Sequence, residues 1–297
     1  MKIDYRNLPT EKQNPSSKNL DRLSISRIVR IMNREDQKVP AAVGRESKNI
    51  AEAAGLMVRS LKSGGRIFFA GAGTSGRLGV LESAEMPPTF NTPPGLAQAI
   101  MAGGRKAVFR SREGAEDDGP GAKREVAKRV RRGDILIGIA ASGVTPFVRE
   151  ALKEARKRRA KTVLVTCNMK TAAPDADVVI APNAGPEIIA GSTRLKSATA
   201  AKMVLNMLTA SSMVHLGKVY GNWMVDLQPK SKKLRERGLR LLQDIAGLSR
   251  RRAETFFKKA DGNVKTAIVM AKKGLDRNRA RRLLNRFGGF IGPALRP

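Results

Sequence analysis

The stretch "FFAGAGTSGRLGVLESAEMPPTF" (residues 68–90) joins the end of an apolar segment to a glycine-rich turn and a short helical pattern. This order is typical of the first strand–turn–helix unit of a parallel α/β sheet. Two kinds of ligand fit such a turn. A dinucleotide would use Gly71, Gly73 and Gly76, which spell G-x-G-x-x-G. A smaller phosphate ester would be bound by the hydroxyl groups of Thr74 and Ser75 and by free backbone N–H groups.

The rest of the chain shows a similar alternation of apolar runs and helical patterns. Short apolar runs recur along it, separated mostly by helical patterns such as 121–132 and 146–159, which predicts an α/β fold with a parallel sheet. The runs do not alternate with polar residues, as expected for strands covered on both faces. The five expected strands are "RIFFA" (66–70), "LAQAIMA" (96–102), "DILIGIA" (134–140), "TVLVTC" (162–167) and "ADVVIA" (176–181).

Three parts are expected along the chain. Helical patterns at 24–34 and 40–62 precede the glycine-rich turn, and a long one spans 192–217. From Lys230 onward there are 20 Lys and Arg against five Asp and Glu, together with four further helical patterns. We therefore expect an N-terminal helical arm (1–50), a sheet domain (51–225) and a small helical domain (226–297).

Composition restricts the class of protein. No run of about eighteen apolar residues occurs, so no membrane span is expected. The first residues, "MKIDYRNLPTEKQNPSSKNLDR", have no apolar signal region, and Cys167 is the only cysteine. We expect a cytoplasmic protein without an internal disulfide.

The charge is unusual, because 57 Lys and Arg against 26 Asp and Glu give a formal net charge of +31. Such a surface attracts polyanions. However, the basic residues are spread along several helical patterns and no aromatic residues interleave with them for base stacking. We expect nucleic acid to bind non-specifically, if it binds at all.

A second loop resembles the first. "ASGVTP" (141–146) follows the third expected strand, and it also combines a glycine, hydroxyl groups and a helix start. A nucleotide site would require an acidic residue after the second strand, which instead ends "AIMAGG" (99–104). Two hydroxyl-bearing loops that face one pocket favour a phosphate monoester instead.

Two groups of carboxylates accompany these loops. "ESAEMPP" contains Glu82 and Glu85, and "REGAEDDG" (112–119) contains Glu113, Glu116, Asp117 and Asp118. Ordinary solvated carboxylates paired with arginines explain the second group equally well. The functional interpretation is one carboxylate from each segment at the phosphate pocket, one acting as base and the other as acid.

Six blocks of sequence, in order, resemble the bacterial N-acetylmuramic acid 6-phosphate etherases. They are "GAGTSGRLGVLESAEMPPTF", "EGAEDD", "GIAASGVTPFV", "GPEIIAGSTRLKSATAAKMVLNML", "GKVYGNWMVD" and "VKTAIVM". The resemblance implies a sugar isomerase (SIS) fold, a three-layer α/β sandwich, followed by a small UBA-like helical domain. It extends from "TEKQNPSSKNLDRLS" to "GGFI". The chain departs from the family pattern at Met86 and Val144.

The resemblance implies a lyase of cell-wall sugar recycling that uses no metal and no cofactor. It would cleave the lactyl ether of its phosphosugar substrate by elimination followed by hydration. Glu85 and Glu116 would be the catalytic carboxylates. Hydroxyl groups of Thr74, Ser75, Ser142 and Thr145 and N–H groups of Gly76 and Gly143 would bind the substrate. Ser192 and Lys196, at the start of the long helix, would also contact it. SIS sites are commonly completed across a homodimer, which the resemblance implies here.

A different class of function remains open. A glucokinase regulatory protein that resembles the etherases has the same SIS architecture and signals without catalysis. It carries two SIS domains in a much longer chain, whereas this chain has room for one. Retention of both Glu85 and Glu116 favours an enzyme.

Overall fold

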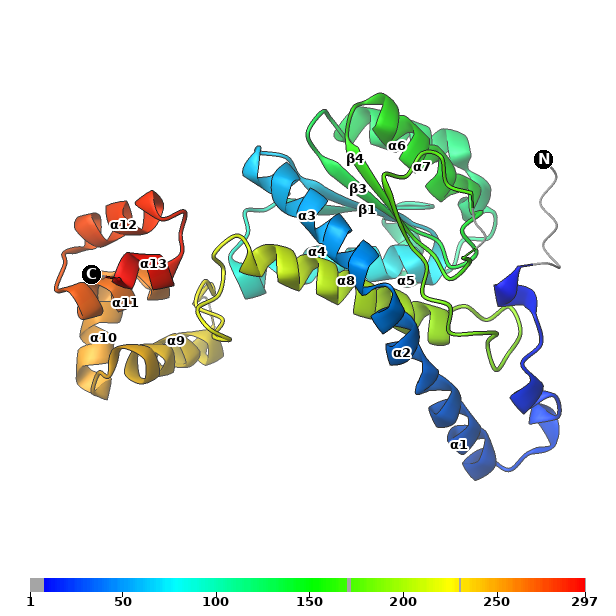
Figure 1. Ribbon diagram of the computed structural model, residues 1–297, viewed down its shortest axis with the longest axis horizontal. Coiled ribbons are helices and arrows are strands. Elements are labelled where there is room, and N and C mark those ends of the chain that lie inside the picture. The colour runs from blue at the N-terminus through cyan, green and yellow to red at the C-terminus, as the bar shows by residue number, and fades with distance from the viewer. Residues whose placement is uncertain (1–7, 170–171, 230, 297) are drawn as a thin grey trace. The chain divides into compact units, whose positions relative to one another are not determined.

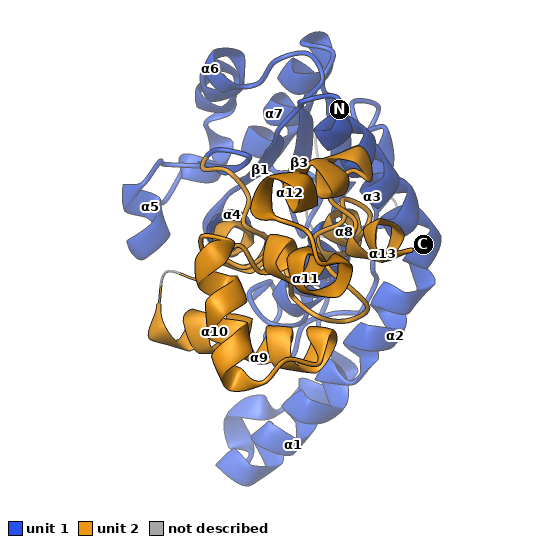
Figure 2. Ribbon diagram, turned by 90° about the vertical axis from the view of Figure 1, so that its left-hand side faces the viewer, with its two compact units in different colours: residues 1–84, 95–209 blue, residues 85–94, 210–297 orange. Residues whose placement is uncertain are grey.

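The computed structural model describes residues 8–169, 172–229 and 231–296. Its contacts divide the chain into two compact units (Figure 2). The first comprises residues 1–84 and 95–209, and the second comprises residues 85–94 and 210–297. Each unit is described by itself. The expected arm, sheet domain and helical domain, with boundaries at residues 50 and 225, stay a prediction.

The first unit contains a five-stranded parallel sheet with strand order β2-β1-β3-β4-β5. Each strand overlaps an apolar run from which it was predicted, so the α/β prediction is confirmed. The bounds are β1 Ile67–Gly71, β2 Ala97–Met101, β3 Ile135–Ile139, β4 Lys161–Val165 and β5 Val178–Ile180.

Helices cover both faces of this sheet (Figure 1). On one face lie α6 (Gly119–Arg129) and α7 (Pro146–Lys157), and on the other lie α3 (Ser47–Lys62), α4 (Gly73–Phe90) and α8 (Lys196–Val214). Phe68 packs in the same core cluster as residues of α6 and α7, whereas its neighbour Phe69 contacts α4 at Gly79. Both faces are therefore buried, which explains why the strands lack polar alternation.

The first unit also contains shorter elements before and between the strands. Residues at the N-terminus form short 3₁₀ turns, and α1 and α2 lead into α3. The bounds are η2 Pro9–Glu11, η3 Pro15–Ser17, η4 Leu20–Arg22, α1 Ile25–Asp36, α2 Lys38–Arg45, α5 Lys106–Phe109 and η5 Ala115–Asp117.

The second unit is helical and has its own apolar core. Four of its helices begin at side-chain caps: Ser231, Ser249, Asn263 and Asp276 each accept a hydrogen bond from a backbone N–H of the first turn. Four of the helices match predicted patterns, and the short α13 was not predicted because "IGPAL" contains Gly and Pro. The bounds are α9 Lys232–Ala246, α10 Arg250–Lys259, α11 Val264–Lys273, α12 Arg277–Arg286 and α13 Ile291–Leu295.

Among the residues that the structure describes, none of the helices combines the length and apolar character needed to traverse a lipid bilayer.

Candidate active site

A cavity of about 340 Å³ lies in the first unit, where loops that follow strands of the sheet come together. Five of the predicted site residues line it: Thr74, Ser75, Glu116, Ser142 and Thr145. The cavity therefore brings together both hydroxyl-bearing loops and one carboxylate of the acidic loop. The remaining lining residues are Leu8, Thr10, Glu11, Ala72, Gly73, Ile139, Ala140, Ala141, Gly191 and Thr193.

The first loop places the start of α4 against the end of β1. The helix begins at Gly73, only two residues after the strand ends at Gly71, so Thr74 and Ser75 lie in its first turn. N–H groups of a first helical turn have no acceptor within the helix, and they carry partial positive charge. The turn thus presents two hydroxyl groups and the positive end of a helix dipole to the cavity.

Gly76 has a different role from the one predicted. Its N–H donates to the carbonyl of Ala72 at 3.1 Å, so it is not free for a ligand. A Cβ at Gly76 would meet the sulfur of Met101 and would lie 2.5 Å from the carbonyl oxygen of Gly71. The motif that resembles a dinucleotide fingerprint therefore serves close packing of helix on strand.

We expect Gly76→Ala to destabilise the protein by about 1–3 kcal/mol, because the added methyl group forces α4 away from β1. Gly44→Ala is the matched control, since Gly44 lies in α2 and nothing approaches its Cβ position within 4 Å. That substitution should be neutral or stabilise by up to about 1 kcal/mol. Denaturant unfolding of both variants measures the difference, and equal stabilities would contradict the packing role of Gly76.

The second loop is anchored to the segment that follows the neighbouring strand β4. The side-chain amide of Asn168 donates to the carbonyl of Ser142 at 3.1 Å, and the hydroxyl of Thr166 donates to the carbonyl of Ala141 at 3.1 Å. Thr145 precedes α7 without a side-chain capping bond, which leaves its hydroxyl available to a ligand. The N–H of Gly143 donates to Ala140 at 2.9 Å, so the prediction that it binds the substrate is not supported.

The carboxylates of the acidic loop (112–119) make different contacts. Gly114, with φ of 71°, starts the 3₁₀ turn η5, which carries Glu116 to the cavity. Asp118 instead caps α6 by accepting a hydrogen bond from the N–H of Gly121 at 2.7 Å. The hydroxyl of Ser111 donates to Glu113 at 3.3 Å. Only Glu116 of this group faces the cavity.

A side chain that sequence reasoning missed ties the segment before this loop to α4. The guanidinium of Arg77 donates to the carbonyl oxygens of Val108 at 2.8 Å and Ala107 at 2.9 Å. Arg77 directly follows the first turn of α4, so it connects α5 to the helix that carries Thr74 and Ser75.

Lys196 does not line the cavity, contrary to prediction. Its side chain is 1% exposed, and its ammonium donates to Glu35 at 2.7 Å and to the carbonyl of Ala184 at 3.0 Å. Its donors are used inside the protein, which leaves it a structural role. Ser192 also lies outside the cavity lining, one turn before α8 begins, and its neighbour Thr193 lines the cavity instead.

The start of α8 is neutralised by a buried carboxylate. Glu187 is 1% exposed and accepts hydrogen bonds from the backbone N–H groups of Lys196 at 2.9 Å and Ser197 at 2.8 Å. A carboxylate at a helix N-terminus occupies the position that an anionic ligand would take. The N–H groups at this helix start are therefore already occupied by a carboxylate of the protein.

Glu85 belongs to the second unit. It is exposed, and it lies in the last part of α4, a helix whose residues 87 and 88 are both proline. Convergence of its carboxylate with that of Glu116 stays a prediction.

The cavity contrasts with the charge of the chain. Among the lining residues that the structure describes there is no Lys or Arg, and the charged side chains are Glu11 and Glu116. The excess of +31 is therefore located elsewhere. Hydroxyl groups and helix dipoles are the groups available here to bind an anion.

Comparison with known proteins identifies relatives along nearly the whole chain. Residues 49–156 match the model of the glucokinase regulatory protein N-terminal SIS domain, and residues 116–211 match the SIS domain model. N-acetylmuramic acid 6-phosphate etherases from Salinibacter ruber and Symbiobacterium thermophilum are each 48% identical, over 98% and 92% of this chain and 95% and 91% of their own lengths. The same enzyme of Geobacillus thermodenitrificans is 44% identical over 97% of this chain and 98% of its own. The fold is therefore of the SIS type, and the chain belongs to the N-acetylmuramic acid 6-phosphate etherase family.

Proposed function

We propose that this protein is an N-acetylmuramic acid 6-phosphate etherase, a carbon–oxygen lyase that releases D-lactate and N-acetylglucosamine 6-phosphate. The single observation that carries the proposal is the cavity of about 340 Å³, in which two hydroxyl-bearing helix starts and the carboxylate of Glu116 meet. This combination suits a ligand with an anionic end and a body that undergoes proton transfer.

The phosphate is assigned to the two loops. Hydroxyl groups of Thr74 and Ser75 from one loop, and of Ser142 and Thr145 from the other, donate to its oxygens. The N-termini of α4 and α7 supply partial positive charge in a site whose described lining has no cationic side chain. This arrangement holds the sugar at one end and leaves its body beside Glu116.

The proposed reaction requires two proton transfers around the lactyl ether. Ring opening exposes an aldehyde at C1, which acidifies the proton on C2. A base removes that proton, the C2–C3 double bond forms, and the C3–O bond breaks while an acid protonates the departing lactate oxygen. Water then adds at C3 and a proton returns to C2, so the net change is hydrolysis of the ether.

Two carboxylates suffice for these steps. Glu116 is one of the pair and Glu85 is the proposed second, with one acting as base while the other acts as acid and the roles reversing during hydration. The position of Glu116 at the cavity wall supports its part in this scheme.

Release of D-lactate from N-acetylmuramic acid 6-phosphate by the purified protein tests the function. We expect stoichiometric formation of D-lactate and N-acetylglucosamine 6-phosphate. Tight binding of the phosphosugar without release of lactate would instead indicate the regulatory alternative. The relatives of 44–48% identity over at least 92% of the chain favour the enzyme over that alternative.

The reaction belongs to cell-wall sugar recycling, and we propose that it takes place in the cytoplasm on a homodimer. Exposed apolar side chains on α1, at Ile25 and Val29, support a second copy as partner, because such side chains are typical of interfaces. Sedimentation of the purified protein at the mass of one chain would rule out the dimer.

Any affinity of the protein for nucleic acid should be non-specific and fall steeply as the salt concentration rises.

A further inference from the structure

The cavity contains a second carboxylate that no step above uses. Glu11, from the N-terminal turn η2, lines the same space as Glu116 and the hydroxyl groups of the two loops. It lies in the block "TEKQNP", to which the sequence analysis assigned no role. Thr10 from the same turn and Thr193 from the segment before α8 line the cavity beside it.

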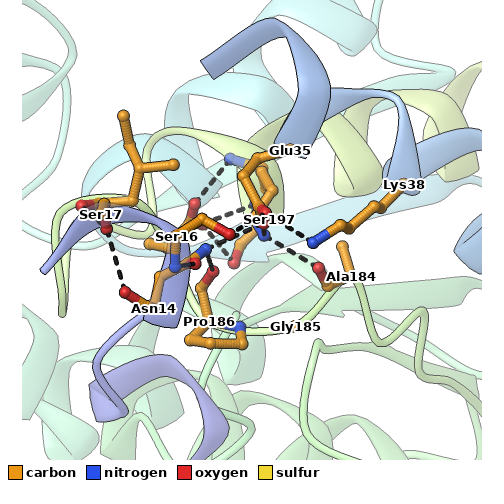
Figure 3. A network of polar contacts seen from close by, with 12 residues as sticks. Asn14, Ser16, Ser17, Glu35, Lys38, Ala184, Gly185, Pro186 and Ser197 are labelled. Atoms are coloured by element: carbon orange, nitrogen blue, oxygen red, sulfur yellow. Dashed lines mark hydrogen bonds and ion pairs between the residues drawn. The ribbon is translucent and has the colours of Figure 1, made fainter. Parts of the chain in front are cut away.

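The segment that carries Glu11 is fixed to the body of the first unit at several points. The carbonyl of Thr10 accepts a hydrogen bond from the N–H of Gly191 at 3.0 Å. Further along, the side-chain amide of Asn14 donates to the carbonyl of Pro186 and to the carboxylate of Glu35, both at 2.9 Å, and Ser17 donates to Ile188 at 2.8 Å (Figure 3). The backbone around Glu11 is therefore held in place before a ligand arrives, which reduces the entropic cost of binding through this residue.

The buried pair of Glu35 and Lys196 supports this attachment. Glu35 accepts from Asn14 and Lys196, and Lys196 also binds the carbonyl of Ala184, at the start of the segment that Asn14 and Ser17 contact. Residues far apart in the chain are thereby joined around the segment that follows Glu11.

The carboxylate of Glu11 retains capacity to accept hydrogen bonds. Within the described part of the chain, one side-chain hydrogen bond reaches it, from the hydroxyl of Thr10 at 3.1 Å, and it forms no ion pair. Gly191, with φ of 77°, makes room for it, since a Cβ there would lie 3.2 Å from Oε2 of Glu11. A carboxylate has about four lone-pair sites, so acceptor positions remain for a ligand.

A carboxylate repels a phosphate group but accepts hydrogen bonds from hydroxyl groups. The phosphate is already assigned to the loops of Ser75 and Ser142, so Glu11 faces the hydroxylated body of the sugar. We infer that Glu11 is a substrate-binding residue, which accepts hydrogen bonds from hydroxyl groups of the sugar and so distinguishes a phosphosugar from other phosphate esters. This inference rests on the proposed function for the nature of the ligand.

The test compares two ligands on two variants. Titration calorimetry measures the affinity of wild type, Glu11→Ala and the control Lys12→Ala for N-acetylglucosamine 6-phosphate and for inorganic phosphate. Lys12 is the exposed neighbour and does not line the cavity. We expect Glu11→Ala to lower the affinity for the sugar phosphate about 10- to 100-fold, because a hydrogen bond to a charged group is lost. The affinity for inorganic phosphate should stay unchanged. Lys12→Ala should bind both ligands like wild type.

Two results would overturn the inference. An equal loss of affinity for both ligands would show that Glu11 merely shapes the cavity, and unchanged affinity for the sugar phosphate would show that it does not contact the sugar. In the lactate assay we expect KM to rise and kcat to stay within about threefold. Failure of wild type to release lactate would contradict the proposed function. The binding test would still apply, because calorimetry requires no turnover.

Discussion

Glu116→Gln is expected to lower kcat for lactate release by about 10²–10⁴-fold while N-acetylglucosamine 6-phosphate still binds. The substitution keeps the size of the side chain and removes its ability to transfer a proton. Glu116 is exposed to the cavity on the 3₁₀ turn η5, and no hydrogen bond of that turn depends on its carboxylate among the bonds of the described residues. The fold should therefore tolerate the change. Initial rates over a range of substrate concentrations separate kcat from KM.

Asp117→Asn is the matched control, since it removes one carboxylate charge from the next residue, which does not line the cavity. Its kcat should stay within about threefold of wild type, because a charge outside the cavity transfers no proton. Glu85→Gln, measured in parallel, tests the assignment of Glu85 as the second catalytic carboxylate and should lower kcat by a similar factor. Full activity of Glu116→Gln would remove Glu116 from the mechanism, and full activity of Glu85→Gln would require another partner for it.

The fold could be predicted from the sequence because each strand and helix is indicated by a short, continuous stretch of residues. An apolar run such as "DILIGIA", followed by a glycine-containing loop and a helical pattern, predicts a buried strand of a parallel sheet without reference to the rest of the chain. The strand β3 accordingly lies within the predicted run. The two hydroxyl-bearing loops were predictable for the same reason, since each directly follows a strand.

The parts of the site that the sequence did not reveal depend on contacts between distant residues. Glu11 lies at the cavity in a segment that is bonded to distant residues, Thr10 to Gly191 and Asn14 to Pro186, the latter 172 positions away. Lys196 was expected to bind the substrate, but it is buried in an ion pair with Glu35, 161 positions away. The N–H groups of Gly76 and Gly143, which were expected to face a ligand, donate within their own turns, and residue types alone do not predict such hydrogen bonds.

Lys196→Met is expected to lower the free energy of unfolding by up to about 3–5 kcal/mol, because it removes the buried ammonium partner of Glu35 and leaves only the half-exposed Lys38 to pair with that carboxylate. Lys153→Met is the matched control. Lys153 pairs with Glu150 at 3.5 Å, and side chains of that pair are 49% and 37% exposed, so its loss should cost less than about 1 kcal/mol. Denaturant unfolding at neutral pH compares the two variants. Equal losses would mean that the buried pair contributes no more than a surface pair.

The same pair makes stability depend on pH in a defined direction. Burial by itself raises the pKa of the Glu35 carboxyl, but hydrogen bonds from Lys196, Lys38 and Asn14 together outweigh it and lower the pKa from 4.5 to about 2. A carboxyl whose pKa is depressed by folding stabilises the protein above its unfolded pKa, and this stabilisation is lost as the pH falls from about 4.5 towards 2. Wild type should therefore lose stability over that interval.

The double variant Glu35→Leu/Lys196→Met separates this ion pair from other acid-sensitive groups. It replaces two buried charges by apolar side chains, so at neutral pH it should regain most of the stability that Lys196→Met loses. It should also lose less stability than wild type between pH 4.5 and pH 3, because the titrating carboxyl is gone. Unfolding curves of both proteins at the two pH values provide the comparison. Parallel loss of stability would assign the acid sensitivity to other carboxylates, and failure of the double variant to recover would show that Asn14 and Ser16 require Glu35 as an acceptor.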